Sequence, residues 1–433
     1  MVNDNKLVYS YLRGKMLIAQ DGINEGSEAE VYGWVLSIRE QKTLSFVIVY
    51  ENRKQVQIVI KDKKLMTSQL KQNSVIWAKG TIKITDKAPN GFEIHVRSLK
   101  VLSKPKKLPP FNIMSTDVPA LDLRLDFRAL DLRRPYNINL FTLRSKALQY
   151  FREYLISKDF LEVQTPKIIA TASEGGAALF PLMYYDKQAF LAQSPQLYKE
   201  ELTMSFEKVF EIGPIFRAEP SRTLKHLSEA ISLDVEAAFH KNEDLMDFLE
   251  DMIRYVINRL YEKEGEALKR IKAPVLDVSK KFPRYSYSEV VSWINKNLEE
   301  IHEGEDLSSK HLEAFGDHAG GFYFIKDWPL KLKPFYIQPK DGDYSNSFDL
   351  MYRGLELSSG GERVHDPALL RKGLKRTGLS AKGFKYHLEV YNYGMPPHGG
   401  FGLGVDRFMM VVTGAENIRE VVLYPRDVRR LVP

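Results

Sequence analysis

Strand-like and helix-like segments of this 433-residue chain are grouped into separate regions instead of alternating. Residues 28–103 hold five segments rich in Val, Ile and aromatic side chains, whereas residues 241–320 carry apolar residues at helical spacing. A parallel sheet would require strands and helices to alternate along the chain. The grouping therefore predicts an α+β fold on an antiparallel sheet, preceded by an all-β N-terminal region.

The five N-terminal segments predict a small barrel. A turn-forming KAPNG stretch separates the last two segments, and a short helix-like stretch, KDKKLMTSQLKQ, follows the third. Five strands with a helix after the third are the arrangement of an OB-type barrel, which binds single-stranded nucleic acid through a strand face. An SH3-like or other small barrel is the alternative.

A proline-rich, basic stretch separates the barrel from the rest of the chain. Five prolines and several Lys and Arg residues fall within residues 104–135, a composition typical of a linker. We expect an OB-type domain at 1–104, a hinge at 105–135, and a larger α+β domain at 136–433 with a helical insertion at about 241–320.

The composition excludes several kinds of site and favours an anionic partner. Cysteine is absent, which excludes disulfides, thiolate zinc sites and cysteine nucleophiles. Together with the absence of an apolar leader and of a bilayer-length apolar stretch, this predicts a cytoplasmic protein with no membrane partner. The formal charge of +7 favours nucleic acid or another anionic partner.

Residues 216–236, FRAEPSRTLKHLSEAISLDVE, interleave charged and apolar side chains. This pattern predicts two strands joined by a loop, with one face packed inside and the other lining a polar pocket. Arg217 can hold a phosphate with its planar guanidinium, and Glu219 points to the same face. Lys225 and His226 on the loop can reach a polyphosphate tail. A surface hairpin with exposed ion pairs is the alternative.

Two further segments carry groups suited to the same pocket. In SFDLMYRGLELSSGGERVHD, Asp349, Glu356 and Ser359 offer hard oxygen ligands for a Mg²⁺ ion that bridges phosphates, with structural salt bridges as the alternative. In HGGFGLGVDRF, Arg407 follows four glycines, so a flat base can lie on bare backbone while the arginine meets a phosphate. Neither a dinucleotide fingerprint nor a Walker lysine is present.

Together the segments resemble the signature motifs of class II aminoacyl-tRNA synthetases. FLEVQTP is similar to the motif that ends in an interface proline, FRAE…KHLSE to the strand–loop–strand that holds ATP, and GGFGLGVDRF to the third motif. With the barrel in front, the whole chain resembles subclass IIb, which serves aspartate, asparagine and lysine. The resemblance implies a class II catalytic domain on an antiparallel sheet flanked by helices. It also implies ATP, Mg²⁺, a tRNA partner and a homodimer formed through the Pro166 motif.

Within subclass IIb the chain is closest to the archaeal and eukaryotic aspartyl type. AQSPQLYKE matches its Gln-Ser-Pro-Gln-Leu-x-Lys pattern, and Lys199 with Arg363 would put two cations beside the side-chain site, which suits a carboxylate better than an amide. The implied reaction activates L-aspartate with ATP and transfers it to the 3′ end of tRNA(Asp), and charging of tRNA(Asn) stays open. The alternatives are an asparaginyl enzyme, an amide-forming relative of the synthetases, and a non-catalytic RNA-binding paralogue.

The resemblance also assigns roles to individual residues, with Arg217 and Arg407 as the catalytic pair. The residues implied to bind ATP are Arg217, Ala218, Glu219, Lys225, His226, Leu227, Glu356, Gly404, Val405, Asp406 and Arg407. Those implied to bind aspartate are Ser173, Glu174, Gln196, Lys199, Arg217, Asp234, Ser359 and Arg363. Those implied to hold Mg²⁺ are Glu356, Ser359 and Asp349, and those implied to contact the anticodon are Arg39, Phe46 and Gln57.

Three features depart from the family pattern. Ala230 stands where many members carry an aromatic residue that stacks on adenine. Residues 173–180 read SEGGAALF where TEGGTELF is more usual, and residues 39–42 read REQK without the common glycine. These departures leave activation intact and put the choice of tRNA in question.

Overall fold

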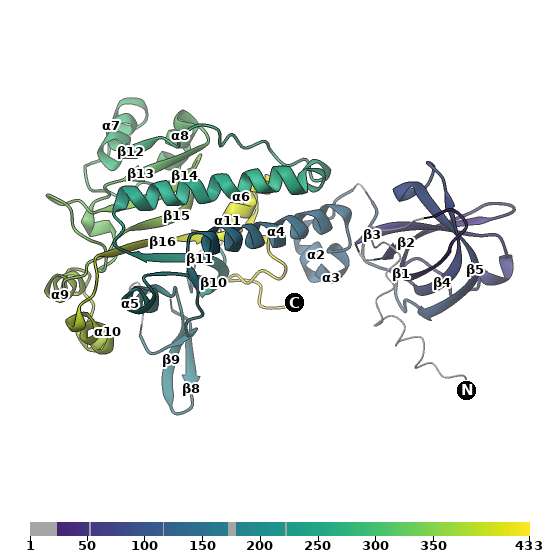
Figure 1. Ribbon diagram of the computed structural model, residues 1–433, viewed down its shortest axis with the longest axis horizontal. Helices are drawn as coiled ribbons and strands as arrows, with labels where there is room; N and C mark the ends of the chain where they lie inside the picture. The colour runs from purple at the N-terminus through teal and green to yellow at the C-terminus, as the bar shows by residue number, and fades with distance from the viewer. Residues whose placement is uncertain (1–23, 52, 116, 172–178, 221–222) are drawn as a thin grey trace. The chain divides into compact units, whose positions relative to one another are not determined.

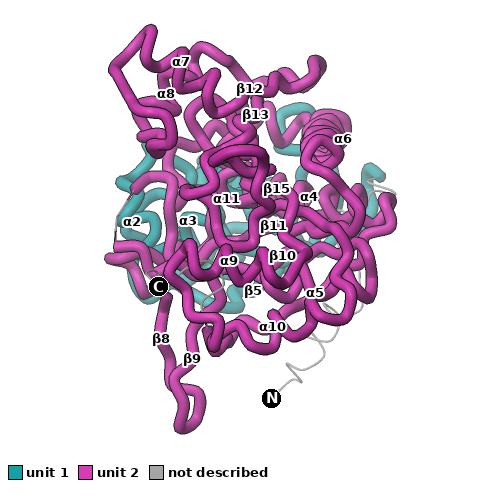
Figure 2. The backbone as a smooth tube through the Cα atoms, turned by 90° about the vertical axis from the view of Figure 1, so that its left-hand side faces the viewer, with its two compact units in different colours: residues 1–138 teal, residues 139–433 magenta. Residues whose placement is uncertain are grey.

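The computed structural model of the chain describes residues 24–51, 53–115, 117–171, 179–220 and 223–433. The chain divides into two compact units, residues 1–138 and 139–433, which Figure 2 colours separately. The expected hinge at 105–135 is thus grouped with the barrel unit. Within the described ranges, no helix has the length and apolar character needed to cross a bilayer.

In the described part of the first unit, five strands close into a barrel in the order β1-β2-β3-β5-β4. They are β1 (Glu28–Glu40), β2 (Ser45–Glu51), β3 (Lys54–Ile60), β4 (Val75–Ile84) and β5 (Phe92–Ser103). Along β2, Val47 and Val49 are fully buried in the barrel core, whereas Phe46 is half-buried on the outer face. The predicted five-stranded OB-type barrel is confirmed.

The helix expected after β3 is the wrong part of that prediction. Throughout this fully described stretch the chain forms only a 3₁₀ turn, η1 (Lys63–Leu65). Leu70 is buried in the barrel core, and the half-buried Leu65 and Met66 pack against that core. A helix this short is marginal on its own, and these contacts do not hold one in place.

Eight strands of the described second unit form one sheet in the order β12-β13-β14-β15-β16-β11-β10-β6. They are β6 (Leu161–Glu162), β10 (Lys208–Phe216), β11 (Glu229–Ala238), β12 (Arg284–Ser286), β13 (Phe322–Lys326), β14 (Ser347–Tyr352), β15 (Leu355–Glu362) and β16 (His398–Gly404). Neighbours are antiparallel except at the two edges, where β12 pairs with β13 and β10 with β6 in parallel. The predicted antiparallel sheet is therefore confirmed, with a parallel pair at each edge.

A smaller sheet of the described residues has the order β7-β9-β8 and projects from the second unit as a hairpin (Figure 1). Its strands are β7 (Ile168–Ile169), β8 (Pro181–Tyr184) and β9 (Lys187–Leu191). The helices are α2 (Leu121–Asp126), α3 (Arg128–Asp131), α4 (Pro135–Ser157), α5 (Gln196–Phe206), α6 (Asn242–Arg270), α7 (Tyr287–Asn297), α8 (Ser309–Ala319), α9 (Pro367–Arg376), α10 (Lys385–Val390) and α11 (Val405–Thr413). Short 3₁₀ turns are η2 (Pro89–Gly91), η4 (Leu330–Leu332), η5 (Ala381–Phe384), η6 (Tyr391–Tyr393) and η7 (Ile418–Glu420).

The two faces of the large sheet differ in character, as β11 shows. Leu233 and Val235 belong to the apolar core that the sheet forms with α4, α6 and α11 (Figure 1). Since successive strand residues point to opposite faces, Ser232, Asp234 and Glu236 turn away from those helices. The sequence of β11 thus builds a polar face opposite the helix-covered one.

Strand β16 lies beside β11 and repeats this alternation with glycines on the polar face. Phe401 and Leu403 enter the same core. A Cβ atom at Gly400 would lie 2.0 Å from the Val235 carbonyl oxygen and 2.4 Å from a carboxylate oxygen of Glu236. Glycine is therefore required at this position so that β16 can sit close to the acidic side chain.

Candidate active site

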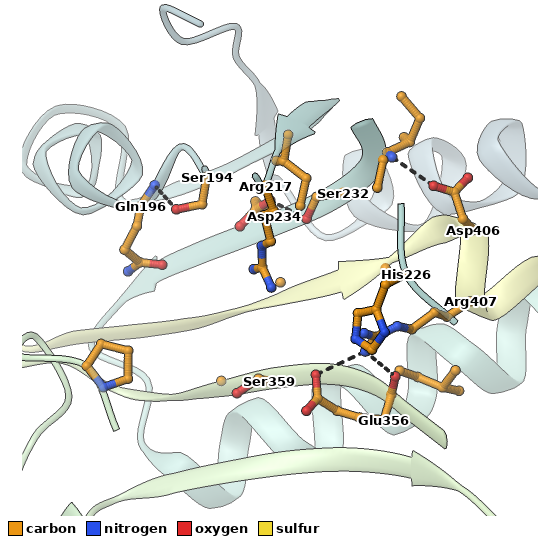
Figure 3. A pocket seen from close by; sticks show the side chains of 18 of the residues that line it. Ser194, Gln196, Arg217, His226, Ser232, Asp234, Glu356, Ser359, Asp406 and Arg407 are labelled. Atoms are coloured by element: carbon orange, nitrogen blue, oxygen red, sulfur yellow. Dashed lines mark hydrogen bonds and ion pairs between the residues drawn. The ribbon is translucent and has the colours of Figure 1, made fainter. Parts of the chain in front are cut away.

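A cavity of about 340 Å³ opens on the polar face of the sheet, and Figure 3 shows it from close by. It brings together most residues that the sequence assigned to ATP and to aspartate. The assigned residues that line it are Gln196, Arg217, Glu219, Lys225, His226, Leu227, Asp234, Glu356, Ser359, Arg363, Gly404, Asp406 and Arg407.

The other assigned residues of this unit do not line the cavity. Ala218, Lys199, Asp349 and Val405 are described and lie outside the cavity wall. Ser173 and Glu174 fall outside the described residues. Val405 is fully buried in the core, because it begins α11 on the side that packs against the sheet.

Arg217 and Arg407 reach the cavity from two different elements (Figure 3). Arg217 directly follows β10, and its backbone N–H donates to the Ser228 carbonyl at 2.9 Å, which closes the strand–loop–strand. Nη1 of Arg407 donates to the Glu356 carbonyl at 2.9 Å and lies 3.3 Å from Oε1 of the same residue. Two guanidinium groups thus face one cavity, an arrangement that can bind a polyphosphate.

His226 comes from the loop between β10 and β11. Its Nδ1 lies 2.6 Å from Oγ1 of Thr223. Burial, together with the positive charges of Arg407 and Arg217, lowers the pKa of His226 below its ordinary value. The imidazole is therefore neutral at neutral pH.

Three oxygen-bearing side chains lie together on β14 and β15. Asp349 and Ser359 are directly paired across the two strands, and Glu356 precedes Ser359 on β15. Burial, opposed by Lys333, raises the pKa of Asp349, and the nearby Glu356 carboxylate adds to the rise. Nζ of Lys333 contacts both Asp349 oxygens at 3.0 and 2.9 Å. Lys333 was missed by the sequence reasoning, because its segment carries no recognisable motif.

The donor set tests whether a metal ion fits this place. Among the described residues, no three His, Cys, Asp or Glu side chains are grouped to hold an ion. Asp349, Glu356 and Ser359 offer two carboxylates and a hydroxyl, which are hard donors. Mg²⁺ keeps several waters and takes only one or two carboxylates along with substrate phosphates, so this smaller set fits it.

A buried cluster of two cations and two anions lies at the other end of the cavity. Nζ of Lys199 is 3.0 Å from Asp234 and 3.3 Å from Glu236. Nε and Nη2 of Arg363 donate to the two Glu236 oxygens at 2.9 and 3.3 Å. Burial alone would lower the pKa of Arg363, but the ion pair with Glu236 raises it, so the guanidinium stays charged.

The structure differs from the sequence-based expectation that Lys199 and Arg363 both lie beside the side-chain site. Lys199 is only 2% exposed and lies beneath the cavity floor, while Arg363 lines the cavity. Glu236 was given no role, although it is fully buried and bridges the two cations. The sequence could have indicated a role for Glu236, because Asp234 and Glu236 are two residues apart on one strand and therefore share a face.

Asp406 holds the third motif in place. One carboxylate oxygen lies 2.6 Å from Nη2 of Arg144 on α4, and the other accepts the Ile231 backbone N–H at 2.9 Å. These bonds tie the start of α11 to α4 and β11. The cavity wall at Gly404 and Arg407 is therefore fixed by buried contacts.

In the barrel unit the three residues assigned to the anticodon lie on the outer strand face. Arg39 and Phe46 are cross-strand partners, and the guanidinium carbon lies 4.9 Å from the centre of the ring. Nε2 of Gln57 donates to Glu93 at 2.9 Å, and His95 lies 2.8 Å from the same carboxylate. Glu93 and His95 were missed, because their strand lies far along the chain from Gln57.

Beneath the large cavity, Glu200 of α5 is paired with His387 of α10. Burial would raise the pKa of Glu200, but the bond and charge of His387 lower it to about 2. Burial would lower the pKa of His387, but its bonds to Glu200 and Glu201 raise it to about 9. Both groups are therefore charged at neutral pH.

The raised pKa of His387 predicts a loss of stability in alkali. A histidine protonated more readily in the folded state stabilises it fully below about pH 6.5, and this contribution is lost as the pH rises through about 9. We expect the free energy of unfolding to fall by about 3 kcal/mol over this window. Urea unfolding at several pH values measures it, and His387→Asn serves as the matched variant. An equal alkaline loss in that variant would contradict the assignment.

Comparison with known proteins gives one family. A family model described as tRNA synthetases class II (D, K and N) matches residues 120–428. An aspartate–tRNA(Asp/Asn) ligase of Methanocaldococcus jannaschii is 44% identical over 94% of this chain and 95% of its own length. A ligase of the same name from Methanosarcina barkeri is 40% identical over 96% of this chain and 97% of its own length.

Solved structures share the fold. The asparaginyl-tRNA synthetase of Pyrococcus horikoshii complexed with asparaginyl-adenylate superposes with a TM-score of 0.90 at 29% identity, covering 94% of this chain and 97% of that one. The aspartyl tRNA synthetase of Entamoeba histolytica gives a TM-score of 0.83 at 29% identity, covering 94% and 90%. Both aspartate and asparagine thus occur among the amino acids named for these structures.

Proposed function

The chain belongs to the class II tRNA synthetases (D, K and N), and we propose that it activates L-aspartate with ATP and transfers it to tRNA(Asp) and tRNA(Asn). The curated relatives named for both tRNAs support this breadth. The observation that carries the choice of amino acid is the buried cluster of Lys199, Arg363, Asp234 and Glu236.

The charges of this cluster favour aspartate over asparagine. The charges of its two cations and two anions cancel one another. Aspartate adds an ammonium group and a side-chain carboxylate, whose charges also cancel. We assign its α-carboxylate to Arg217. Asparagine would add the ammonium alone and leave a positive charge without compensation next to a buried cluster, which is costly.

We propose a two-step reaction in the cavity. An oxygen of the aspartate α-carboxylate attacks the α-phosphorus of ATP, and the bond to pyrophosphate breaks to leave aspartyl-adenylate. The terminal ribose hydroxyl of the tRNA then attacks the activated carbonyl, losing its proton as AMP departs. Arg217 stabilises negative charge at the α-phosphorus, and Arg407 holds the distal phosphates, so catalysis is positioning and charge stabilisation.

The remaining assignments complete this proposal. Glu356, Ser359 and Asp349 would hold Mg²⁺, which offsets phosphate charge when bound. Glu219 and the bare backbone at Gly404 face the base, whereas Lys225 and His226 face the distal phosphates. Leu227 keeps its ATP role, and Ser173, Glu174 and Gln196 keep their amino-acid roles. Ala218 and Val405 lie outside the cavity wall, and Asp406 supports that wall through its bonds to Arg144 and Ile231.

We propose a homodimer that works in the cytoplasm, where its tRNA partners are. A groove lined by Thr165, Pro166, Tyr198 and Tyr393 lies at the proline of the first motif, and Tyr393 is 74% exposed. An exposed groove with apolar side chains, next to a motif that resembles an interface motif, can be covered by a second copy of the chain. Sedimentation velocity at micromolar concentration measures the mass, and a monomer there would contradict this part.

Charging assays test the proposed function. Transcripts of tRNA(Asp) and tRNA(Asn) are each incubated with ATP and labelled aspartate or labelled asparagine. We expect aspartate on both transcripts and asparagine on neither. Aspartate on tRNA(Asp) alone would narrow the proposal to one tRNA, and asparagine on tRNA(Asn) would overturn it.

Phe46→Ala is expected to weaken use of tRNA while leaving adenylate formation unchanged. The ring lies on the outer strand face, half-buried, where it can stack on an unpaired base. Loss of one base–aromatic stack of about 1.5 kcal/mol raises KM for tRNA about tenfold. Charging kinetics measure it, with tRNA-independent pyrophosphate exchange as the internal reference. Phe46→Tyr is the matched control and is expected to behave like the wild type.

A further inference from the structure

Gln196, at the start of α5, is held by a buried carboxylate one helical turn further on. Its Nε2 donates to Oε1 of Glu200 at 2.6 Å. Glu200 is fully buried, and Gln196 is 4% exposed while still lining the cavity. The amide therefore stands between a buried anion and the open site.

A second layer of contacts holds Glu200 itself. Oη of Tyr391 donates to its Oε2 at 2.6 Å, and Nε2 of His387 lies 3.4 Å from the same oxygen. The other imidazole nitrogen, Nδ1, lies 2.7 Å from Oε1 of Glu201. Helix α10 and the η6 turn thus clamp the carboxylate from the side opposite Gln196.

This arrangement decides which way the Gln196 amide points. A carboxylate offers only acceptors, so the amide must turn its NH₂ group to Glu200 and its oxygen away from it. Figure 3 shows the amide oxygen of Gln196 on the side that faces Arg217. The flipped amide would set two acceptors against each other in a buried place and leave the carboxylate short of a donor.

We propose that Glu200, clamped by Tyr391 and His387, is a positioning residue that keeps the amide oxygen of Gln196 turned into the cavity to accept a hydrogen bond from the α-ammonium group of the amino-acid substrate. This inference rests on the proposed activation of an amino acid in the cavity. Glu200 itself touches no substrate and acts through Gln196 alone.

The ammonium group makes this orientation matter. It carries only donors, so an amide oxygen attracts it and an amide NH₂ group repels it. Because the amide oxygen is already fixed, binding of the substrate does not bear the free-energy cost of reorienting the side chain. Losing the fixed orientation should therefore weaken binding of the amino acid and leave binding of ATP unchanged.

Glu200→Gln is the first test. The new amide can present its oxygen or its NH₂ group to Gln196, so both orientations of Gln196 become possible. We expect KM for aspartate in pyrophosphate exchange to rise about tenfold, with KM for ATP unchanged and kcat within about threefold. Glu207→Gln is the matched control, because Glu207 is exposed at the C-terminal end of the same helix and lines neither the cavity nor the groove at Pro166. It is expected to leave both KM values unchanged.

A charge swap separates positioning from mere structural support. Gln196→Glu alone sets two carboxylates within contact and is expected to raise KM for aspartate more than tenfold. Adding Glu200→Gln restores a donor–acceptor pair and leaves a carboxylate oxygen facing the ammonium. We expect the double variant to recover at least tenfold in KM relative to Gln196→Glu. If the increases in KM of the two single variants simply added in the double variant, the positioning role would be overturned.

Tyr391→Phe keeps the inference testable if Glu200→Gln does not fold. It removes one bond to Glu200 and nothing else, and a rise of about threefold in KM for aspartate is expected. Exchange by the wild-type chain, run alongside, reports on the proposed function separately. With that exchange present, an unchanged KM for aspartate in both Glu200→Gln and Tyr391→Phe overturns the positioning role alone.

Discussion

Replacing Arg217 by lysine is expected to lower aspartate-dependent pyrophosphate exchange by about a thousandfold. Arg217 lines the cavity just after β10, where its planar fork can hold two oxygens of the α-phosphate at once. Lysine keeps the charge but forms a single point contact, so stabilisation of the developing negative charge is lost. Steady-state exchange measures the effect, which should fall mainly on kcat.

Arg429→Lys serves as the control for this substitution. Arg429 is exposed near the C-terminus and does not line the cavity. The control is expected to exchange pyrophosphate at the wild-type rate. A kcat within about threefold of wild type for Arg217→Lys would remove Arg217 from the catalytic centre.

Arg363→Leu is expected to lower kcat/KM for aspartate by at least about a thousandfold while ATP binding is kept. The guanidinium is the cation of the buried cluster that lines the cavity. Its removal also leaves Glu236 with Lys199 as its remaining cationic partner, so stability should fall by about 3–5 kcal/mol. Exchange kinetics and urea unfolding measure the two effects on one preparation.

The double variant Arg363→Leu/Glu236→Gln separates recognition from stability. In Arg363→Leu the carboxylates of Glu236 and Asp234 share Lys199 as their cation. Removing the charge of Glu236 should therefore return most of the lost stability, because Lys199 then pairs with Asp234 alone. Aspartate exchange should stay lost. If aspartate KM were unchanged in either variant, Arg363 would be a structural residue only.

The strand–loop–strand was predictable because its signal is local. Charged and apolar residues alternate within residues 216–236, and alternation alone decides which side chains share a face. The structure has β11 there, with Leu233 in the core and Asp234 in the cavity wall. Motif spacing likewise identified the third segment, because the glycines and Arg407 follow one another directly.

The parts that escaped prediction depend on contacts between distant segments. Tyr391 donates a hydrogen bond to Glu200 across 191 positions of the chain, and no pattern in either segment predicts this contact. Lys333 reaches Asp349 from a segment without a motif. The helix expected after β3 is absent for a different reason, because Leu65, Met66 and Leu70 reach the barrel core from a 3₁₀ turn and the loop after it, without forming a helix.

The fold alone does not distinguish aspartate from asparagine. The asparaginyl structure superposes at a TM-score of 0.90 and the aspartyl structure of Entamoeba histolytica at 0.83. The choice therefore rests on the charges beneath the cavity. A non-catalytic RNA-binding paralogue is disfavoured, because Arg217, Glu356 and Arg407 converge on one cavity.

Pyrophosphate exchange into ATP, measured with aspartate, asparagine or lysine as the sole amino acid and without tRNA, tests the central claim most directly. It reports the activation step alone and needs no assumption about the tRNA. The account predicts exchange with aspartate and none with the other two. Exchange with asparagine at a comparable rate would contradict the role given to the cluster of Lys199, Arg363, Asp234 and Glu236.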